Sequence, residues 1–206
     1  AYWAIPAGEP TAVNGEWENG PGAPFFEALK DELGELPIIA EDLGHITPDV
    51  EELRERFEFP GMNILQFAFA SDAGNPYLPH NLRQNALIYT GTHDNDTTVG
   101  WYAKREKDEL DNLHTYLGPV DEPIHWALIR MAHRTVADLS LIPMQDVLGL
   151  GSEARMNTPG KMGGNWTWRF TEDQIDPDQW AKLKEMTRAY GRIKLEKEDE
   201  SRPEWM

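Results

Sequence analysis

Residues 86–96 read ALIYTGTHDND, a short apolar run followed at once by seven residues that are glycine or polar. The run is typical of a buried strand, and helical spacing of apolar residues follows it near 104–117 and 123–139. Such alternation predicts an α/β fold with a parallel sheet. The remaining strands are expected at 36–40, 63–69 and 141–148, and the remaining helices at 24–33, from Thr47 to Phe57, and near 177–190.

The four expected strands all end in polar, glycine-bearing loops. In a (β/α)8 barrel the working residues lie at the C-terminal ends of the strands, and a typical barrel has about 250 residues and eight strands. We therefore expect residues 1–206 to form the C-terminal half of a TIM-type barrel, with a frayed tail at 194–206. The opening AYWAIPAGEP has neither an initiator Met nor a signal segment, which indicates a fragment without the N-terminal half.

Composition excludes several classes of protein. The chain has 19 Lys and Arg against 36 Asp and Glu, a net charge of −17, which argues against binding to nucleic acid phosphates. It has no cysteine, and no apolar stretch approaches the roughly 20 residues that span a membrane. Eight tryptophans beside many carboxylates suit the binding of a sugar, although any single tryptophan is more often a core residue.

Two carboxylates are the candidates for acid–base chemistry. Glu41 and Asp94 each follow an expected strand, where two carboxyl groups could divide acid and charge-stabilising roles. Either could instead be a helix cap or an ion-pair partner. His93 could donate to a sugar hydroxyl, and His80 with Asn81 forms a weaker candidate of the same kind. The histidine spacing supports no metal site, and no dinucleotide, P-loop or GxSxG motif is present, so no cofactor is expected.

Seven motifs together resemble the 4-α-glucanotransferases, the amylomaltases or disproportionating enzymes of the cytoplasm or plastid. The resemblance runs nearly end to end but covers only the C-terminal part of proteins usually about 500 residues long. The motifs are YWAIP (2–6), NGEW (14–17), IIAEDLG (38–44), NPYLPHN (75–81), YTGTHDNDT (89–97), PMQDVLGLG (143–151) and the stretch from NTPG (157–160) to Asn165-Trp166.

The resemblance implies a retaining double displacement on α-1,4-glucans. Glu41 matches the family's general acid/base, and Asp94 matches the carboxylate that stabilises the transition state, with His93 beside it. The family's nucleophile is an Asp in an Arg-x-Asp-His-Phe-Arg stretch, which these 206 residues lack. Relatives often carry a substrate-binding acid after Phe69, where this chain has Ala70. The residues expected to bind glucan are His93, Asp42, His80, Asn81, Asn165, Trp166 and, as the carboxylate nearest to Ala70, Asp72.

The expected partners are α-1,4-glucans and maltooligosaccharides, without nucleic acid or membrane. Without the nucleophile, the chain alone is expected to be inactive. A half-barrel would expose sheet edges, so self-association or pairing with the missing N-terminal half is also expected. Two alternatives stay open: a non-catalytic half-barrel that binds glucans or pairs with another chain, and, less favoured because its motifs differ, an α-amylase-type hydrolase.

Overall fold

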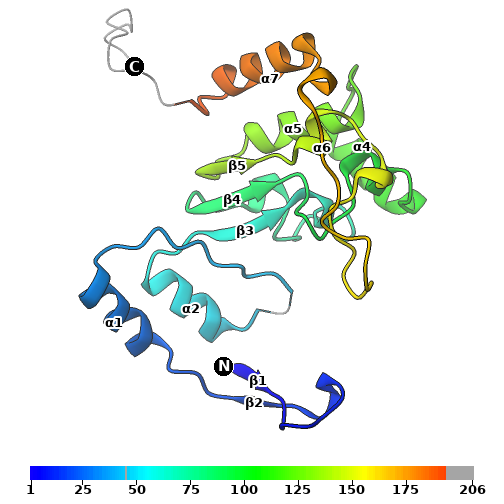
Figure 1. The fold of residues 1–206 in the computed structure, drawn as a ribbon. Coiled ribbons are helices and arrows are strands. Elements are labelled where there is room, and N and C mark those ends of the chain that lie inside the picture. Colours follow the sequence, from blue (N-terminus) through cyan, green and yellow to red (C-terminus); the bar gives the residue numbers. More distant parts are fainter. Residues whose placement is uncertain (45, 194–206) are drawn as a thin grey trace, which may run out of the picture. The chain divides into compact units, whose positions relative to one another are not determined.

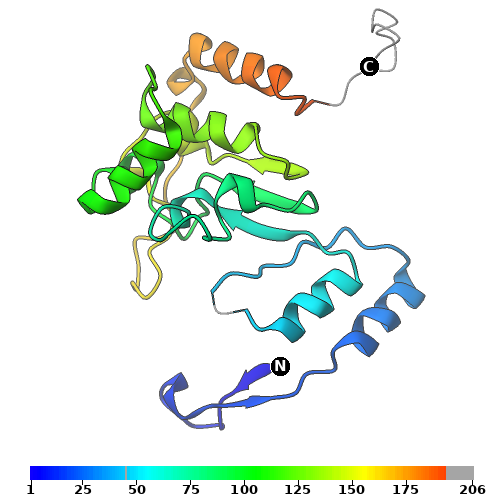
Figure 2. The ribbon, with the colours of Figure 1, turned by 180° about the vertical axis from the view of Figure 1, so that it is seen from behind.

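The computed structural model describes residues 1–44 and 46–193, shown from two sides in Figures 1 and 2. The chain divides into two compact units, Ala1–Gly61 and a second that starts at Met62. The units differ in packing, because none of the described residues in 1–60 is buried, whereas the second unit holds the hydrophobic core. Within the described residues, no helix has the length and apolar character needed to cross a membrane.

The first unit opens with a hairpin that the sequence analysis did not predict. Strand β1 (Tyr2–Ala4) pairs antiparallel with β2 (Glu16–Glu18), and the short helix η1 (Ala12–Asn14) lies between them in the chain. Strands of three residues are too short to show a period-two pattern. Helices α1 (Ala23–Leu33) and α2 (Pro48–Arg56) follow, close to the bounds expected for them.

The strand expected at 36–40 is not formed, which corrects the prediction. These residues belong to no strand or helix; the Ala40 N–H donates to the Pro60 carbonyl at 3.0 Å, and the described part of the segment joins no sheet. A strand is stable only when a neighbouring strand accepts and donates along its length. An apolar run such as Leu36–Ala40 records the tendency to be buried, not the presence of that neighbour.

The second unit is built on a three-stranded parallel sheet with the strand order β3-β4-β5. The strands are β3 (Gly61–Ile64), β4 (Ala86–Tyr89) and β5 (Leu139–Leu141), and Tyr89 pairs with Leu141 at the C-terminal ends of β4 and β5. Strand β4 fits its prediction, whereas the strands expected at 63–69 and 141–148 were wrong in extent. The chain turns into η2 (Leu65–Phe67) after β3, and Met144–Val147 forms the helix α6.

Helices cover the sheet and complete the core of the second unit. The helix expected near 104–117 is present as α4 (Lys107–Leu117), preceded by the separate helix α3 (Thr98–Tyr102). Helix α5 (Ile124–His133) is almost wholly buried, because it packs toward the sheet on one side and α7 (Pro177–Ala189) runs along its other side (Figures 1 and 2). Three 3-10 turns lie in the connections: η3 (Pro79–Asn81), η4 (Ser152–Ala154) and η5 (Glu172–Gln174).

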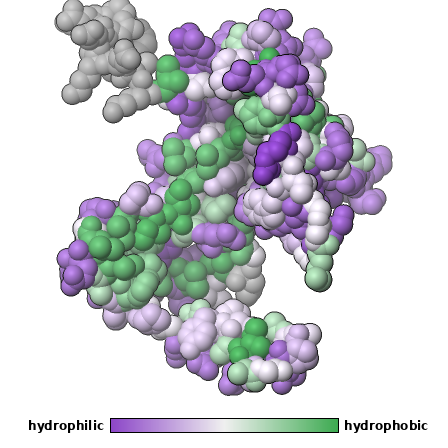
Figure 3. Space-filling view, viewed as in Figure 1, coloured by the Kyte–Doolittle hydropathy of each residue, from purple (hydrophilic) through white to green (hydrophobic). Residues whose placement is uncertain are grey.

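Strand β5 leaves apolar side chains at the surface. Leu139 and Leu141 are about half exposed, and Figure 3 shows hydrophobic residues gathered over this part of the second unit. The tail expected at 194–206 lies outside the described residues.

Candidate functional site

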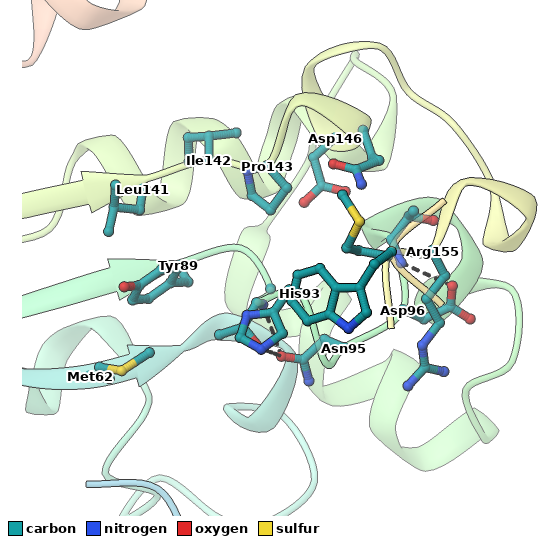
Figure 4. Close-up of a pocket in the computed structure, with 16 residues that line it drawn as sticks. Met62, Tyr89, His93, Asn95, Asp96, Leu141, Ile142, Pro143, Asp146 and Arg155 are labelled. Atoms are coloured by element: carbon teal, nitrogen blue, oxygen red, sulfur yellow. Dashed lines mark hydrogen bonds between the residues drawn. The ribbon is translucent and has the colours of Figure 1, made fainter. Parts of the chain in front are cut away.

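A cavity of about 390 Å³ lies at the C-terminal end of the sheet in the second unit. Met62, Tyr89 and Leu141, one from each strand, line its apolar side. Figure 4 shows Asp96 and Arg155 on the opposite side, with His93 between them and the strand residues, so the cavity has an apolar and a polar side. This combination suits a ligand that has both hydroxyl groups and apolar ring faces.

The loop from Gly91 to Thr97 folds through its own side chains. The Asn95 Oδ1 atom accepts hydrogen bonds from the Thr92 N–H at 2.9 Å and the Thr92 hydroxyl at 2.8 Å. The Thr97 hydroxyl caps α3 by accepting from the Gly100 N–H at 3.1 Å. Several of the polar groups that follow β4 are therefore satisfied within the loop. The loop leaves the side chains of His93 and Asp94 about half exposed.

Asp94 is held by a second loop. The Asn157 side-chain amide donates to Asp94 Oδ1 at 2.6 Å, and the Arg155 guanidinium donates to the Asp94 carbonyl at 2.6 Å. The His93 Nε2 atom lies 3.4 Å from the same Oδ1. A neutral amide thus orients the Asp94 carboxylate, and a guanidinium holds the backbone of the same residue, beside the cavity that His93 lines.

Trp166 brings an indole ring to the same place. Its ring centroid lies 5.0 Å from that of His93, the two ring planes are inclined by 38°, and the residue is 54% exposed. The backbone N–H of Trp166 donates to the Met156 carbonyl at 2.8 Å. The backbone φ of Trp166, +62°, lies in the left-handed region that residues other than glycine rarely adopt. The expected residues His93, Asp94 and Trp166 are therefore together.

Asp96 anchors the polar side of the cavity. Burial opposes ionisation of its carboxyl group, but hydrogen bonds from the Lys104 ammonium at 2.5 Å and the Ser152 hydroxyl at 2.8 Å lower its pKa. The Gln66 side-chain amide donates to the Asp96 carbonyl at 2.8 Å. This cluster joins the 91–97 loop to η2, to the turn that follows α3 and to η4.

Four other expected residues have structural partners. His80 Nε2 and the Asn81 amide both contact the Ala73 carbonyl, at 3.1 and 2.9 Å, and His80 Nδ1 lies 3.0 Å from the Tyr116 hydroxyl. Asp72 accepts from the Gly74 N–H at 2.8 Å. Asn165 bridges its own loop, accepting from the Thr158 N–H and donating to the Lys161 carbonyl. These bonds shape loops, so a role in binding glucan stays a prediction for each residue.

Glu41 and Asp42 belong to the first unit. Glu41 is exposed. The Asp42 carboxylate lies 3.2 Å from Arg54 Nε, and it packs so closely on Gly61 that a Cβ there would lie 2.3 Å from Asp42 Oδ2. Asp42 therefore forms an ion pair that joins the AEDLG segment to α2.

The sequence analysis did not assign roles to Asn157 or Arg155. Asn157 opens the NTPG motif, which was noted only as part of the resemblance, and Arg155 stands two residues before it. A guanidinium and an amide that reach 61 and 63 residues back along the chain, respectively, give no local pattern. Only the fold reveals their contact with Asp94.

The sequence and the structure of this chain both match those of known proteins. Residues 1–174 match the family model described as 4-alpha-glucanotransferase. The 4-alpha-glucanotransferase of Synechocystis sp. is 55% identical over 195 residues, covering 93% of this chain and 39% of the relative. The chloroplastic/amyloplastic 4-alpha-glucanotransferase of Solanum tuberosum is 49% identical, covering 93% and 34%.

A solved structure gives the same result. The amylomaltase from Streptococcus agalactiae in complex with acarbose matches with a TM-score of 0.89 and 37% identity, over 94% of this chain and 39% of that one. The chain thus spans 39% or less of the length of these three relatives.

Proposed function

This chain belongs to the 4-alpha-glucanotransferase family, and on that premise we propose that it forms part of an enzyme that transfers α-1,4-glucan segments to acceptor sugars. The reaction would be a double displacement with retention, in which one carboxyl group protonates the leaving oxygen and another attacks the anomeric carbon. The fold supports this reading through a parallel sheet whose middle strand, β4, leads into the loop that carries His93 and Asp94.

We assign the acid/base role to Glu41 and transition-state stabilisation to Asp94. The acid must carry a proton at the moment when the glycosidic oxygen leaves, and must take one from the acceptor in the second step. The stabilising carboxylate must stay ionised beside the positive charge that develops on the sugar ring. The bond from the Asn157 amide to Asp94 Oδ1 supports that role, because it fixes the orientation of the carboxylate, and Arg155 holds the backbone carbonyl of the same residue.

The observation that carries the proposal is the grouping of His93, Asp94 and Trp166 beside one cavity. The exposed indole offers a flat face on which the apolar face of a glucose ring can stack. The imidazole and the carboxylate lie within reach of hydroxyl groups on the same ring. Maltooligosaccharides are therefore the ligands that we propose for this chain.

We further propose that the chain on its own binds glucans without transferring them. The 206 residues contain no Arg-x-Asp-His-Phe-Arg stretch, in which the family's nucleophilic Asp is expected. Without a nucleophile no glycosyl-enzyme forms, so the first displacement stops. The part of the enzyme that supplies the nucleophile would lie outside these residues.

Two tryptophans on the chain allow a matched test. Trp166 and Trp180 are 54% and 49% exposed, but only Trp166 contacts His93, whereas Trp180 lies on α7. Loss of one aromatic contact worth about 1 kcal/mol should weaken binding of maltoheptaose about fivefold in Trp166→Ala, and not in Trp180→Ala. Isothermal titration calorimetry measures both. Equal affinity of the two variants would contradict the proposed site.

The same preparations test catalysis. Incubated with maltotriose, the chain should release no glucose above a buffer control. Glucose release that disappears in Glu41→Gln would show that the chain transfers or hydrolyses glucan by itself, and would overturn the proposal that it is inactive alone.

A further inference from the structure

Asp146 is a buried carboxylate that the proposed chemistry does not use. It lies in α6, is 1% exposed, and accepts three hydrogen bonds. The donors are the hydroxyl of Thr90, the N–H of Thr98 at 2.7 Å and the hydroxyl of Thr98 at 2.8 Å. A carboxylate is costly to bury, and replacing buried ionic groups by apolar ones is often neutral for stability. Its bonds to two separate parts of the chain point to a geometric role.

The two threonines stand at the two ends of one loop. Thr90 directly follows β4, and Thr98 is the first residue of α3. The seven residues between them include His93 and Asp94. One carboxylate thus bonds both ends of the loop that presents the candidate catalytic groups, and fixes the distance that the loop must span.

Asp146 is itself fixed in place. Its carbonyl lies 2.7 Å from Nδ1 of His125, a buried residue of α5. Burial lowers the pKa of His125, which favours the neutral ring, and with the proton on Nδ1 this ring donates a hydrogen bond to the carbonyl. The backbone N–H of Asp146 donates to the Pro143 carbonyl at the start of α6. Asp146, which bonds both ends of the loop, is therefore connected to α5, the central helix of the second unit.

We propose that Asp146 is a positioning residue, which holds the 91–97 loop in the conformation that turns His93 and Asp94 toward the glucan. This inference rests on the proposed function only for the identity of the ligand. The loop conformation itself is a property of the chain, and it can be measured without any sugar.

The first measurement is amide hydrogen exchange in the complete chain. Asp146→Ala removes all three acceptors, so exchange at Thr98 and within 92–96 should rise at least tenfold. Asp146→Asn keeps one carbonyl oxygen for the Thr98 N–H and should restore part of the protection. Val147→Ala is the matched control, because Val147 is the buried neighbour of Asp146 in α6 but packs on Trp126 and Met186.

In Val147→Ala, the faster exchange should centre on α6 and α7 and leave the 91–97 loop protected. Loop protection in Asp146→Ala equal to that of the unmodified chain, or loop exchange in Val147→Ala as fast as in Asp146→Ala, would overturn the proposal. If Asp146→Ala does not fold, the comparison of Asp146→Asn with Val147→Ala decides by the same criterion.

The second measurement is the affinity for maltoheptaose. It should fall at least fivefold in Asp146→Ala and recover in part in Asp146→Asn, while Val147→Ala keeps the affinity of the unmodified chain. If the unmodified chain binds no maltoheptaose, the proposed function fails, whereas the exchange experiment still decides the role of Asp146. Affinity unchanged in a variant whose loop is loosened would overturn the link between the loop and the ligand.

Discussion

Gly100 shows how closely the polar side of the cavity is packed. A Cβ at this position of α3 would lie 2.3 Å from Ser152 Oγ and 2.6 Å from Asp96 Oδ1. Both atoms belong to the cluster that Lys104 joins. Only glycine, whose side chain is a single hydrogen atom, leaves room at this position of α3 for the Ser152 and Asp96 side chains.

Gly100→Ala should therefore destabilise the chain, although alanine is the better helix former. Forcing one methyl group into a packed site costs about 1–3 kcal/mol, which exceeds the gain of about 1 kcal/mol in helix propensity. Urea denaturation gives the free energy of unfolding. In a Ser152→Ala background the nearest atom is gone, so the same substitution should cost about 1 kcal/mol less. Simple additivity of the two substitutions would contradict this account.

Residue types in the sequence predicted the centre of the site better than its margins. His93, Asp94 and Trp166 do come together, because a polar loop after a buried strand has few other places to go. His80, Asn81 and Asn165 have similar side chains, but they hydrogen-bond to backbone carbonyls or N–H groups of nearby loops. The sequence shows which groups can donate and accept, and only the fold shows which partner each one meets.

Elements were predictable where a pattern extended over several turns. Helices α1, α2 and α7 begin and end within a few residues of their expected bounds, and β4 does as well. The run at 141–148 was misassigned, because a segment this short, with Gln145 and Asp146 inside it, can form one buried helical turn as readily as a strand. Pro143 marks the boundary, as the N-cap of α6.

Glu122 connects helices α5 and α7 and makes the stability of the chain depend on pH. It accepts a two-pronged hydrogen bond from Arg130 of α5, at 2.7 and 3.0 Å, and lies 2.9 Å from Lys182 of α7. The Arg130 guanidinium, and then the Lys182 ammonium, outweigh burial and lower the pKa of Glu122 from 4.5 to about 2. The ion pairs thus stabilise the fold when Glu122 is ionised.

Because the folded-state pKa is the lower one, this stability is present above pH 4.5 and is lost as the pH falls toward 2. Glu122→Gln should lower the free energy of unfolding at pH 7 by about 1–2 kcal/mol, after allowance for solvent around the exposed part of Arg130. It should also flatten the decline between pH 4.5 and 2. Asp111→Asn, which removes an exposed pair with Lys107, is the control, and an equal loss there would refute the prediction.

On the scale of the whole chain, the two units differ in what holds them. The second unit has a core of aliphatic and aromatic residues around α5. The first unit has partly buried rings instead, such as Phe26, whose ring centroid lies 5.2 Å from those of Phe57 and Phe59. Composition alone gave no sign of this difference, because apolar residues occur throughout. Burial depends on which segments meet, and that is not a property of any single window of sequence.

Exposed apolar side chains and a charge of −17 act against each other in solution. Leu33, Leu139 and Leu141 are 64%, 50% and 41% exposed, which favours association, while like charge opposes it. Raising NaCl from about 0.05 M to about 0.5 M screens the repulsion, so the average mass in light scattering should rise. Leu139→Glu should reduce the rise. A monodisperse monomer at both salt concentrations would rule out this expectation.

The backbone conformation of Trp166 has a consequence for protein engineering. Its backbone angle, with φ at +62°, costs a tryptophan roughly 1 kcal/mol that glycine would not incur. Directed evolution under heat selection alone would therefore favour glycine at this position and discard the ring that lies against His93. A library screened for thermal robustness needs a parallel screen for maltoheptaose affinity, or its winners will be sturdier molecules without the indole on which the proposed site depends.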